Sequence, residues 1–300
     1  MKSEVTDEGI ITLDAHGSRF DPGKRVLYVL DARHTLAVRN RSFSVRRDDG
    51  SELISIPHQR IGRIEVGPFP DFSRKALDLA LEHGIEFSLL DGFGQTRGSM
   101  STSEGRRASL QLAQAAAILN DERRLAFARA FVISRIRNQR TQLMRLNRTR
   151  QLQEVDAALE SMLRSLRKVE QQSAIEALRG IEGAASAAYW PAIGQMLNDQ
   201  PLVDFRRKRP ADDPLNTTIN YLTAILERDI RAAIQSAGLH PGFGFLHASK
   251  DRHDGLIYDL MEPFRAPLTE GIAVYLFNAH RLRAEMFLAG DMRPIEMNDD

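Results

Sequence analysis

The chain has 300 residues, which fits about two domains, and its 41 basic and 40 acidic residues leave a net charge of +1. With 42% hydrophobic and 27% charged residues, it can bury a core and is typical of a globular protein rather than a disordered one. It has no cysteine, which excludes disulfides, thiolate metal sites and cysteine nucleophiles. The first residues include acids and lack the apolar stretch typical of a secretory leader, and no apolar run approaches about 18 residues. We therefore expect a cytoplasmic protein without a membrane segment.

The first hundred residues have the pattern of a β-rich domain. Short runs of alternating apolar and polar residues predict strands at 10–13, 25–30, 35–39, 42–47, 52–56, 60–66 and 85–90. One helix is expected from Ser73 to Glu82, ended by Gly84. Small polar residues at 99–106 predict a linker, so the first domain is expected to span 1–98.

The remaining residues, 107–300, have apolar residues at helical spacing. Asp213 can cap a helix that begins at Pro214, and Gly238 can end it. The expected fold class is therefore α+β, with a small N-terminal β-rich, β-sandwich-like domain followed by a larger all-α domain.

A carboxylate between two glycines lies in the middle of this helical region. Ser173 and Glu176 have the spacing of a capping box for a short helix that ends near Gly180. Glu182, followed by Gly183, would then lie near the start of the next helix, where the helix dipole favours any carboxylate. On the residues alone, this is the ordinary explanation of Glu182.

Positive charge is concentrated at the start of the helical region. Residues 101–150 contain 11 arginines and 3 acidic residues, a local net charge of +8. One expected helix face carries Arg123, Arg137, Arg140 and Arg148, and an expected loop carries Arg206, Arg207, Lys208 and Arg209. Such rows can follow a phosphate backbone. A solvated helix face has the same pattern, and the residues leave both interpretations open.

The last fifty residues have the opposite balance, with 10 acidic and 5 basic residues. Asp259 and Glu262 are three residues apart, so on a helix both carboxylates leave the same face. Two such acids repel each other unless a cation or a proton lies between them. His247 lies twelve residues before the pair, and carboxylates with one imidazole suit Mg²⁺ or Mn²⁺ better than Zn²⁺. A solvated pair of acids is the alternative.

Several motifs follow one another in an order that resembles one known family. They are FVISRIRNQR (131–140), IEGAASAAYW (181–190), DDPLNTTINYLTAIL (212–226), AGLHPGFGFLH (237–247) and LIYDLMEPFR (256–265). The first domain agrees, because ISIPHQRIGRIEV (54–66) is similar to the β-domain of the same family. Together they resemble the CRISPR-associated endonuclease and integrase, the larger protein of the spacer-acquisition module.

The resemblance implies an N-terminal domain used for homodimerisation and a helical catalytic domain that holds one Mg²⁺ or Mn²⁺ ion. It implies Glu182, His247 and Glu262 as catalytic metal ligands and Asp259 as a further catalytic acid. Double-stranded DNA would be the substrate, and a small ferredoxin-like CRISPR-associated partner protein would bridge two dimers. Tyr189, about two turns after Glu182 on a helix, could reach DNA, with core packing as the alternative.

The sequence departs from the family pattern at a few positions. Arg135 stands where the family commonly has Lys, and Thr223 stands where it commonly has an aromatic residue.

The predicted function is a metal-dependent DNA endonuclease and integrase. It would insert new spacers into a CRISPR array by attack of a DNA 3′-hydroxyl on a phosphodiester. Two alternatives stay open, a stand-alone metal-dependent nuclease on branched repair intermediates and a non-catalytic DNA-binding scaffold.

Overall fold

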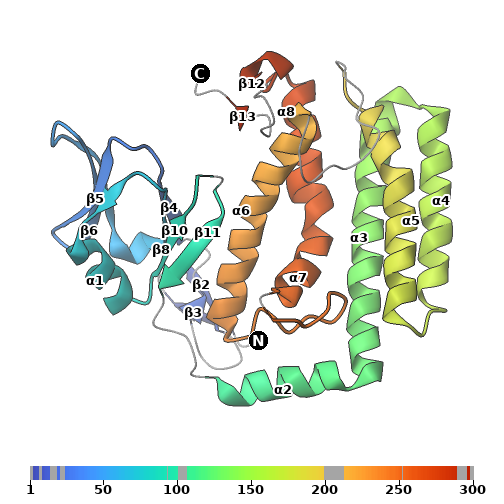
Figure 1. The fold of residues 1–300 in the computed structure, drawn as a ribbon, viewed down its shortest axis with the longest axis horizontal. Helices are drawn as coiled ribbons and strands as arrows, with labels where there is room; N and C mark the ends of the chain where they lie inside the picture. The colour runs from blue at the N-terminus through green and yellow to red at the C-terminus, as the bar shows by residue number, and fades with distance from the viewer. Residues whose placement is uncertain are drawn as a thin grey trace. The chain divides into compact units, whose positions relative to one another are not determined.

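Figure 1 shows the computed structural model of the chain as a ribbon. It describes residues 3–6, 9–13, 19–20, 24–92, 94–100, 107–198, 213–251, 253–288 and 296–297. The chain divides into two compact units, Met1–Glu104 and Gly105–Asp300. This division falls inside the predicted linker. Among the described helices, none combines the length and apolar character that crossing a bilayer requires.

The N-terminal unit contains two four-stranded sheets. The first has the order β11-β10-β8-β4 and consists of β4 (Arg25–Val29), β8 (Ile61–Val66), β10 (Glu86–Leu90) and β11 (Thr96–Met100). Its β4–β8 and β8–β10 pairs are parallel, whereas β10–β11 is antiparallel. The second has the order β7-β6-β5-β9 and consists of β5 (His34–Arg39), β6 (Ser42–Arg47), β7 (Glu52–Pro57) and β9 (Asp71–Phe72). A smaller sheet contains β1 (Ser3–Thr6), β2 (Gly9–Leu13) and β3 (Arg19–Phe20).

Alternation of apolar residues along the strands builds the core of this unit. Phe43 of the second sheet and Ile64 and Phe87 of the first are fully buried in one cluster with residues of α1 (Arg74–Glu82). The predicted helix is confirmed, because the Ser73 side chain caps it and Gly84 follows it with a φ of 64°. Strand β11 continues two residues into the predicted linker, because Ser99 pairs with Ser88 of β10 despite its small polar side chain.

The C-terminal unit consists largely of helices, as the sequence predicted, and adds one short pair of strands. The helices are α2 (Ala108–Leu119), α3 (Asp121–Arg150), α4 (Gln153–Val169), α5 (Ile175–Gly194), α6 (Pro214–Ala237), α7 (Gly255–Arg265) and α8 (Gly271–Asn278). Short elements complete it: η2 (Ala266–Glu270), η3 (Ala284–Met286), β12 (Phe287–Leu288) and β13 (Glu296–Met297). The predicted α6 boundaries are confirmed, because Asp213 caps its start and Gly238, with a φ of 75°, ends it.

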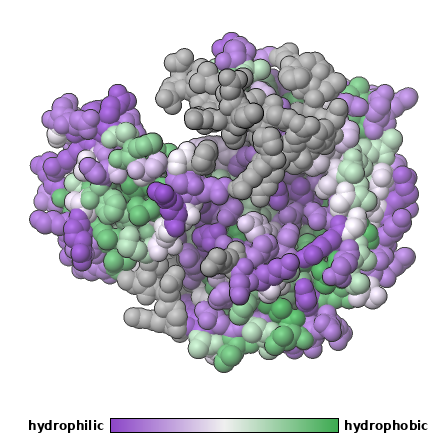
Figure 2. Space-filling view, in the orientation of Figure 1, coloured by the Kyte–Doolittle hydropathy of each residue, from purple (hydrophilic) through white to green (hydrophobic). Residues whose placement is uncertain are grey.

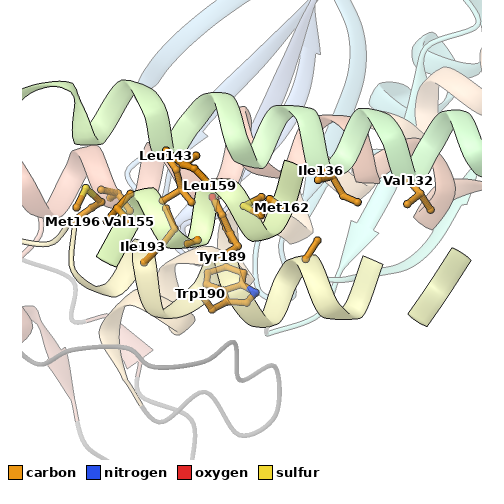
Figure 3. Close-up of a cluster of buried hydrophobic side chains, with 14 of the residues drawn as sticks. Val132, Ile136, Leu143, Val155, Leu159, Met162, Tyr189, Trp190, Ile193 and Met196 are labelled. Carbon is orange, nitrogen blue, oxygen red and sulfur yellow. The ribbon is translucent and has the colours of Figure 1, made fainter. Parts of the chain in front are cut away.

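The core of this unit lies between α3, α4 and α5, which run side by side (Figure 1). Figure 3 shows Ile136 and Leu143 of α3, Met162 of α4, and Tyr189 and Ile193 of α5 in one cluster. These five side chains are fully buried. Their burial fixes which face of α3 and which face of α5 point away from this core.

Helix α5 contradicts the predicted short helix that ends near Gly180. It begins at Ile175 and continues without a break through Gly180 and Gly183. Burial of Leu178 and Tyr189 against the neighbouring helices stabilises the helix on both sides of the glycines. Tertiary packing therefore outweighs the local tendency of glycine to end a helix.

Helix α7 passes into α8 through the π-helical turn η2. Pro267 in this turn has no N–H to donate to the carbonyl of Pro263, one turn earlier. The side chain of Asn138 on α3 donates to that carbonyl instead, with an N–O distance of 2.6 Å. The wider turn is therefore held by a side chain from another helix.

Helix α2 has an apolar exposed surface. Leu112 and Leu119 are 71% and 84% exposed. Figure 2 shows this apolar surface at the lower edge of the molecule, where Figure 1 places α2. On its other side Gln114 exchanges two hydrogen bonds with the backbone of His240, and Ala117 and Ile118 pack against an apolar cluster.

Candidate active site

Three elements of the helical unit bring the predicted ligands together. Glu182 lies in the middle of α5, Glu262 lies near the end of α7, and His247 lies in the loop between α6 and α7. Glu262 and His247 both act electrostatically on Glu182, although 80 positions separate the two glutamates. Glu182 thus lies in the middle of α5, within electrostatic reach of Glu262, and not near a helix start as its glycines indicated.

Asp259 of α7 holds the loop that carries His247. One of its oxygens, Oδ1, accepts hydrogen bonds from the backbone N–H and the ring Nδ1 of His247, both at 2.8 Å. The other accepts from the backbone N–H groups of Phe245 and Leu246. Asp259 has no exposed surface, and all four of these hydrogen bonds go to the segment from Phe245 to His247.

The same contact determines which nitrogen of His247 is available. A carboxylate can only accept hydrogen bonds, so Nδ1 of the neutral ring carries the proton and Nε2 presents its lone pair. The His247 side chain is 30% exposed. A carboxylate behind a histidine is a common arrangement for histidines that bind a metal.

Glu262 is paired with two guanidinium groups. Its Oε2 lies 3.2 Å from Nε of Arg135 on α3, and its Oε1 accepts from Nη1 of Arg265 at 3.3 Å. Arg135 also pairs with Glu270, with 2.8 Å between Nη2 and Oε1. Arg135, Glu262 and Glu270 are all buried, so these charges interact in a medium that screens them weakly.

The two neighbouring glutamates have opposite pKa shifts. Burial, together with the negative charge of Glu262, raises the pKa of the Glu182 carboxyl above its usual value. Burial acts on Glu262 in the same direction, but Arg135 and Arg265 outweigh it and hold the pKa of Glu262 below its usual value. A pair of carboxyl groups with pKa values pushed apart is typical of functional sites.

Among the described residues, no three histidine or acidic side chains share one coordination sphere. The sequence-based expectation that Glu182, His247 and Glu262 do so is therefore not met in this conformation. In the same conformation, Arg135 and Arg265 engage both oxygens of Glu262.

The chemistry of the cluster nevertheless fits a hard divalent cation. Two carboxylates and one imidazole are a donor set suited to Mg²⁺ or Mn²⁺. The charges also fit when all the acids are ionised and His247 is neutral. Four carboxylates and two guanidinium groups then leave a net charge of −2, from Glu182, Asp259, Glu262 and Glu270 against Arg135 and Arg265.

The predicted DNA-contacting arginines of α3 differ in exposure. Arg123, Arg137 and Arg148 are exposed, as a phosphate-binding row requires. Arg140 is half-buried, and its Nε donates to the carbonyl of Leu159 on α4 at 3.3 Å. Arg140 thus links two helices, which accounts for its position without DNA.

The other predicted DNA contacts lie elsewhere. Tyr189 is fully buried in the core between the helices (Figure 3), which contradicts a direct contact with DNA. The basic cluster Arg206, Arg207, Lys208 and Arg209 lies outside the described residues.

Sequence reasoning missed two residues beside the site. Glu270 follows Glu262 by eight residues, which an α-helix would turn about 80° away from it. The wider π-helical turn brings both carboxylates to Arg135, and a pattern search at helical spacing has no signal for this. Arg179 of α5 donates from Nη2 to the Leu246 carbonyl at 2.6 Å, which ties the His247 loop to α5.

The fold and the candidate site together define the class of this protein. It has a β-rich unit followed by a helical unit, and the helical unit contains a site of carboxylate, histidine and arginine side chains. The family model described as "CRISPR associated protein Cas1" matches residues 27–300. The chain therefore belongs to the Cas1 family.

Curated relatives agree with the family model. The chain is 30% identical to the CRISPR-associated endonuclease Cas1 2 of Rhodospirillum rubrum, over 89% of this chain and 82% of the relative. It is 28% identical to the CRISPR-associated endonuclease Cas1 3 of Thermus thermophilus, over 88% of this chain and 78% of the relative.

Solved structures share the fold. A CAS1 protein from Thermotoga maritima has a TM-score of 0.76 at 22% identity and covers 92% of this chain and 85% of its own. A chain of a Cas6-RT-Cas1–Cas2 complex has a TM-score of 0.76 at 23% identity, over 94% of this chain and 31% of its own. A casposase bound to an integration product has a TM-score of 0.75 at 21% identity, over 92% of this chain and 79% of its own.

Proposed function

We propose that this chain is a cytoplasmic, metal-dependent DNA endonuclease and integrase that inserts new spacers into a CRISPR array. The observation that carries the proposal is that His247 and Glu262 act electrostatically on Glu182, in surroundings with two more carboxyl groups than guanidinium groups. Membership of a family whose relatives are named endonucleases supports the nuclease activity. The fold of a casposase bound to an integration product supports DNA joining.

The residues of the chain have separate roles in this proposal. Glu182, Glu262 and Nε2 of His247 would hold Mg²⁺ or Mn²⁺, and Asp259 keeps the His247 ring in the required orientation. The ion would supply a positive charge against the negative charge that develops on the scissile phosphate. Because the attacking group is a 3′-hydroxyl of DNA, no nucleophile from the protein is needed.

The proposal includes an assembly. The N-terminal unit would form a homodimer, and a small ferredoxin-like CRISPR-associated protein would bridge two such dimers on double-stranded DNA. A solved structure of a Cas1–Cas2 complex that contains a chain of this fold supports the partner protein.

The test is a DNA-joining reaction. Labelled duplex with free 3′-hydroxyls is incubated with a plasmid, Mn²⁺ or Mg²⁺, the partner protein and the full chain. We expect the label to enter the plasmid, and 3′-dideoxy ends to abolish joining because the nucleophile is then missing. His247→Ala should abolish joining, whereas His34→Ala, a change in the N-terminal unit, should not.

Two outcomes would contradict the proposal. Efficient cutting of branched DNA without entry of the label would favour the stand-alone repair nuclease. DNA binding without cutting or joining would favour the non-catalytic scaffold.

A further inference from the structure

Arg135 is a buried cation shared by two carboxylates. It is 4% exposed and extends from α3 between Glu262 of α7 and Glu270 of the η2 turn. Although burial opposes it, the two carboxylates raise the pKa of Arg135, with Glu270 as the larger cause. A buried guanidinium without such partners would cost several kcal/mol, so the arrangement of its two partners is a structural requirement.

The two partners hold Arg135 unequally. Nη2 lies 2.8 Å from Oε1 of Glu270, whereas Nε lies 3.2 Å from Oε2 of Glu262. Glu270 is 1% exposed and lies in an element that carries none of the proposed metal ligands. Arg135 is therefore held more closely by Glu270, which is not among the proposed metal ligands, than by Glu262.

Without the charge of Glu270, Arg135 would be balanced by Glu262 alone. A closer guanidinium pair at Glu262 would then compete directly with a metal ion for the same oxygens. Glu262 also pairs with Arg265, whose side chain is 21% exposed. Arg265 can turn toward solvent when a cation arrives, but Arg135 is enclosed and cannot.

We propose that Glu270 is a positioning residue of the metal site, which binds Arg135 so that Glu262 stays available to a divalent cation. The inference rests on the proposed function, because the cation at Glu262 is itself a proposal. The π-helical turn makes the pairing of Glu270 with Arg135 possible. In an α-helix, Glu270 would be turned about 80° away from Glu262, and both carboxylates would not reach Arg135.

The test measures Mn²⁺ binding to the full chain without DNA, by calorimetry and by electron paramagnetic resonance. We expect Glu270→Gln to weaken Mn²⁺ binding by about 10-fold to 100-fold, the usual range for a residue that supports a metal ligand. The matched control is Glu227→Gln on α6, which removes a partly buried carboxylate paired with Arg231 and should leave Mn²⁺ binding unchanged.

A double variant separates this role from a general loss of negative charge. If Glu270 acts through Arg135, then Arg135→Gln/Glu270→Gln should bind Mn²⁺ more tightly than Glu270→Gln alone. The double variant also avoids an unpaired buried charge, which keeps the test valid if Glu270→Gln fails to fold. In that case the double variant is compared with Arg135→Gln, and the two should bind Mn²⁺ alike.

The outcomes distinguish this inference from the proposed function. Tight Mn²⁺ binding by wild type that Glu270→Gln leaves unchanged would overturn the role of Glu270 alone. The role of Glu270 would also be overturned if Glu270→Gln weakened Mn²⁺ binding as much in the Arg135→Gln background as it does in wild type. Absence of Mn²⁺ binding by wild type would overturn the metal site and, with it, this inference.

Discussion

The hydroxyl group of Tyr189 lies near charged side chains in the core of the helical unit. Its ring packs against Trp190 with 5.3 Å between centroids, and it has no exposed surface. Burial, and then the negative charge of Glu270, raise the pKa of this phenol well above its usual value. The neutral phenol is therefore part of the folded state.

Alkaline pH should consequently destabilise the protein through Tyr189. In the unfolded chain the phenol ionises near pH 10, but in the folded protein it stays protonated at that pH. Its contribution to the free energy of unfolding is complete below about pH 10 and is lost as the pH rises above this value.

Phenolate absorbance measures this effect. Tyr189→Phe should remove one phenol from the absorbance step that accompanies alkaline unfolding and should leave the reversible titration unchanged. A smaller reversible step in Tyr189→Phe would contradict the burial of this residue.

At the scale of single residues, the sequence indicated which side chains to consider for the candidate site, but not which groups they contact. The acid pair Asp259 and Glu262 was found from its spacing, and the family resemblance added Glu182 and His247 as partners. Spacing could not show that Asp259 faces the loop backbone, because Phe245 and Leu246 donate to it through main-chain groups that every residue has.

The helices show the same contrast between local and tertiary causes. The boundaries of α1 and α6 were predictable because caps at Ser73 and Asp213 are local interactions. The length of α5 was not, because helices far away in sequence stabilise it across Gly180 and Gly183. The π-helical turn was not predictable either, since it depends on Asn138 of another helix.

The η2 turn can be tested through the carbonyl of Pro263. Asn138→Ala leaves this carbonyl without its donor and should lower the free energy of unfolding by about 1–3 kcal/mol. Pro267→Ala supplies a backbone N–H one turn later. In that background the cost of Asn138→Ala should be smaller, as chemical denaturation of the four variants would measure. Strictly additive costs would show that the two donors do not replace each other.

Across the whole molecule, the small net charge of +1 conceals a basic helix and an acidic C-terminal region. If α3 follows a DNA backbone, Arg123→Ala, Arg137→Ala and Arg148→Ala should each weaken binding equally for all DNA sequences. The slope of log K against log salt concentration should fall by about one for each change.

Arg33→Ala in the N-terminal unit is the control for this experiment, since the Arg33 side chain is 78% exposed and pairs with Asp31. It should leave the slope unchanged. Arg140→Ala should instead lower stability, because it removes the contact with α4. Salt slopes of the three α3 variants that match wild type would mean that the row is a solvated helix face.

The two glycines of α5 have a consequence for how this protein could be stabilised. No atom of the described neighbours lies within 4 Å of a Cβ placed at Gly180 or Gly183, apart from the local backbone. Glycine in a helix interior costs about 1 kcal/mol relative to alanine, so alanines at both positions would add about 2 kcal/mol without a steric clash. Helix α5 thus holds an unused reserve of thermal stability at two positions close to Glu182 in the sequence, as expected where activity and stability are in conflict.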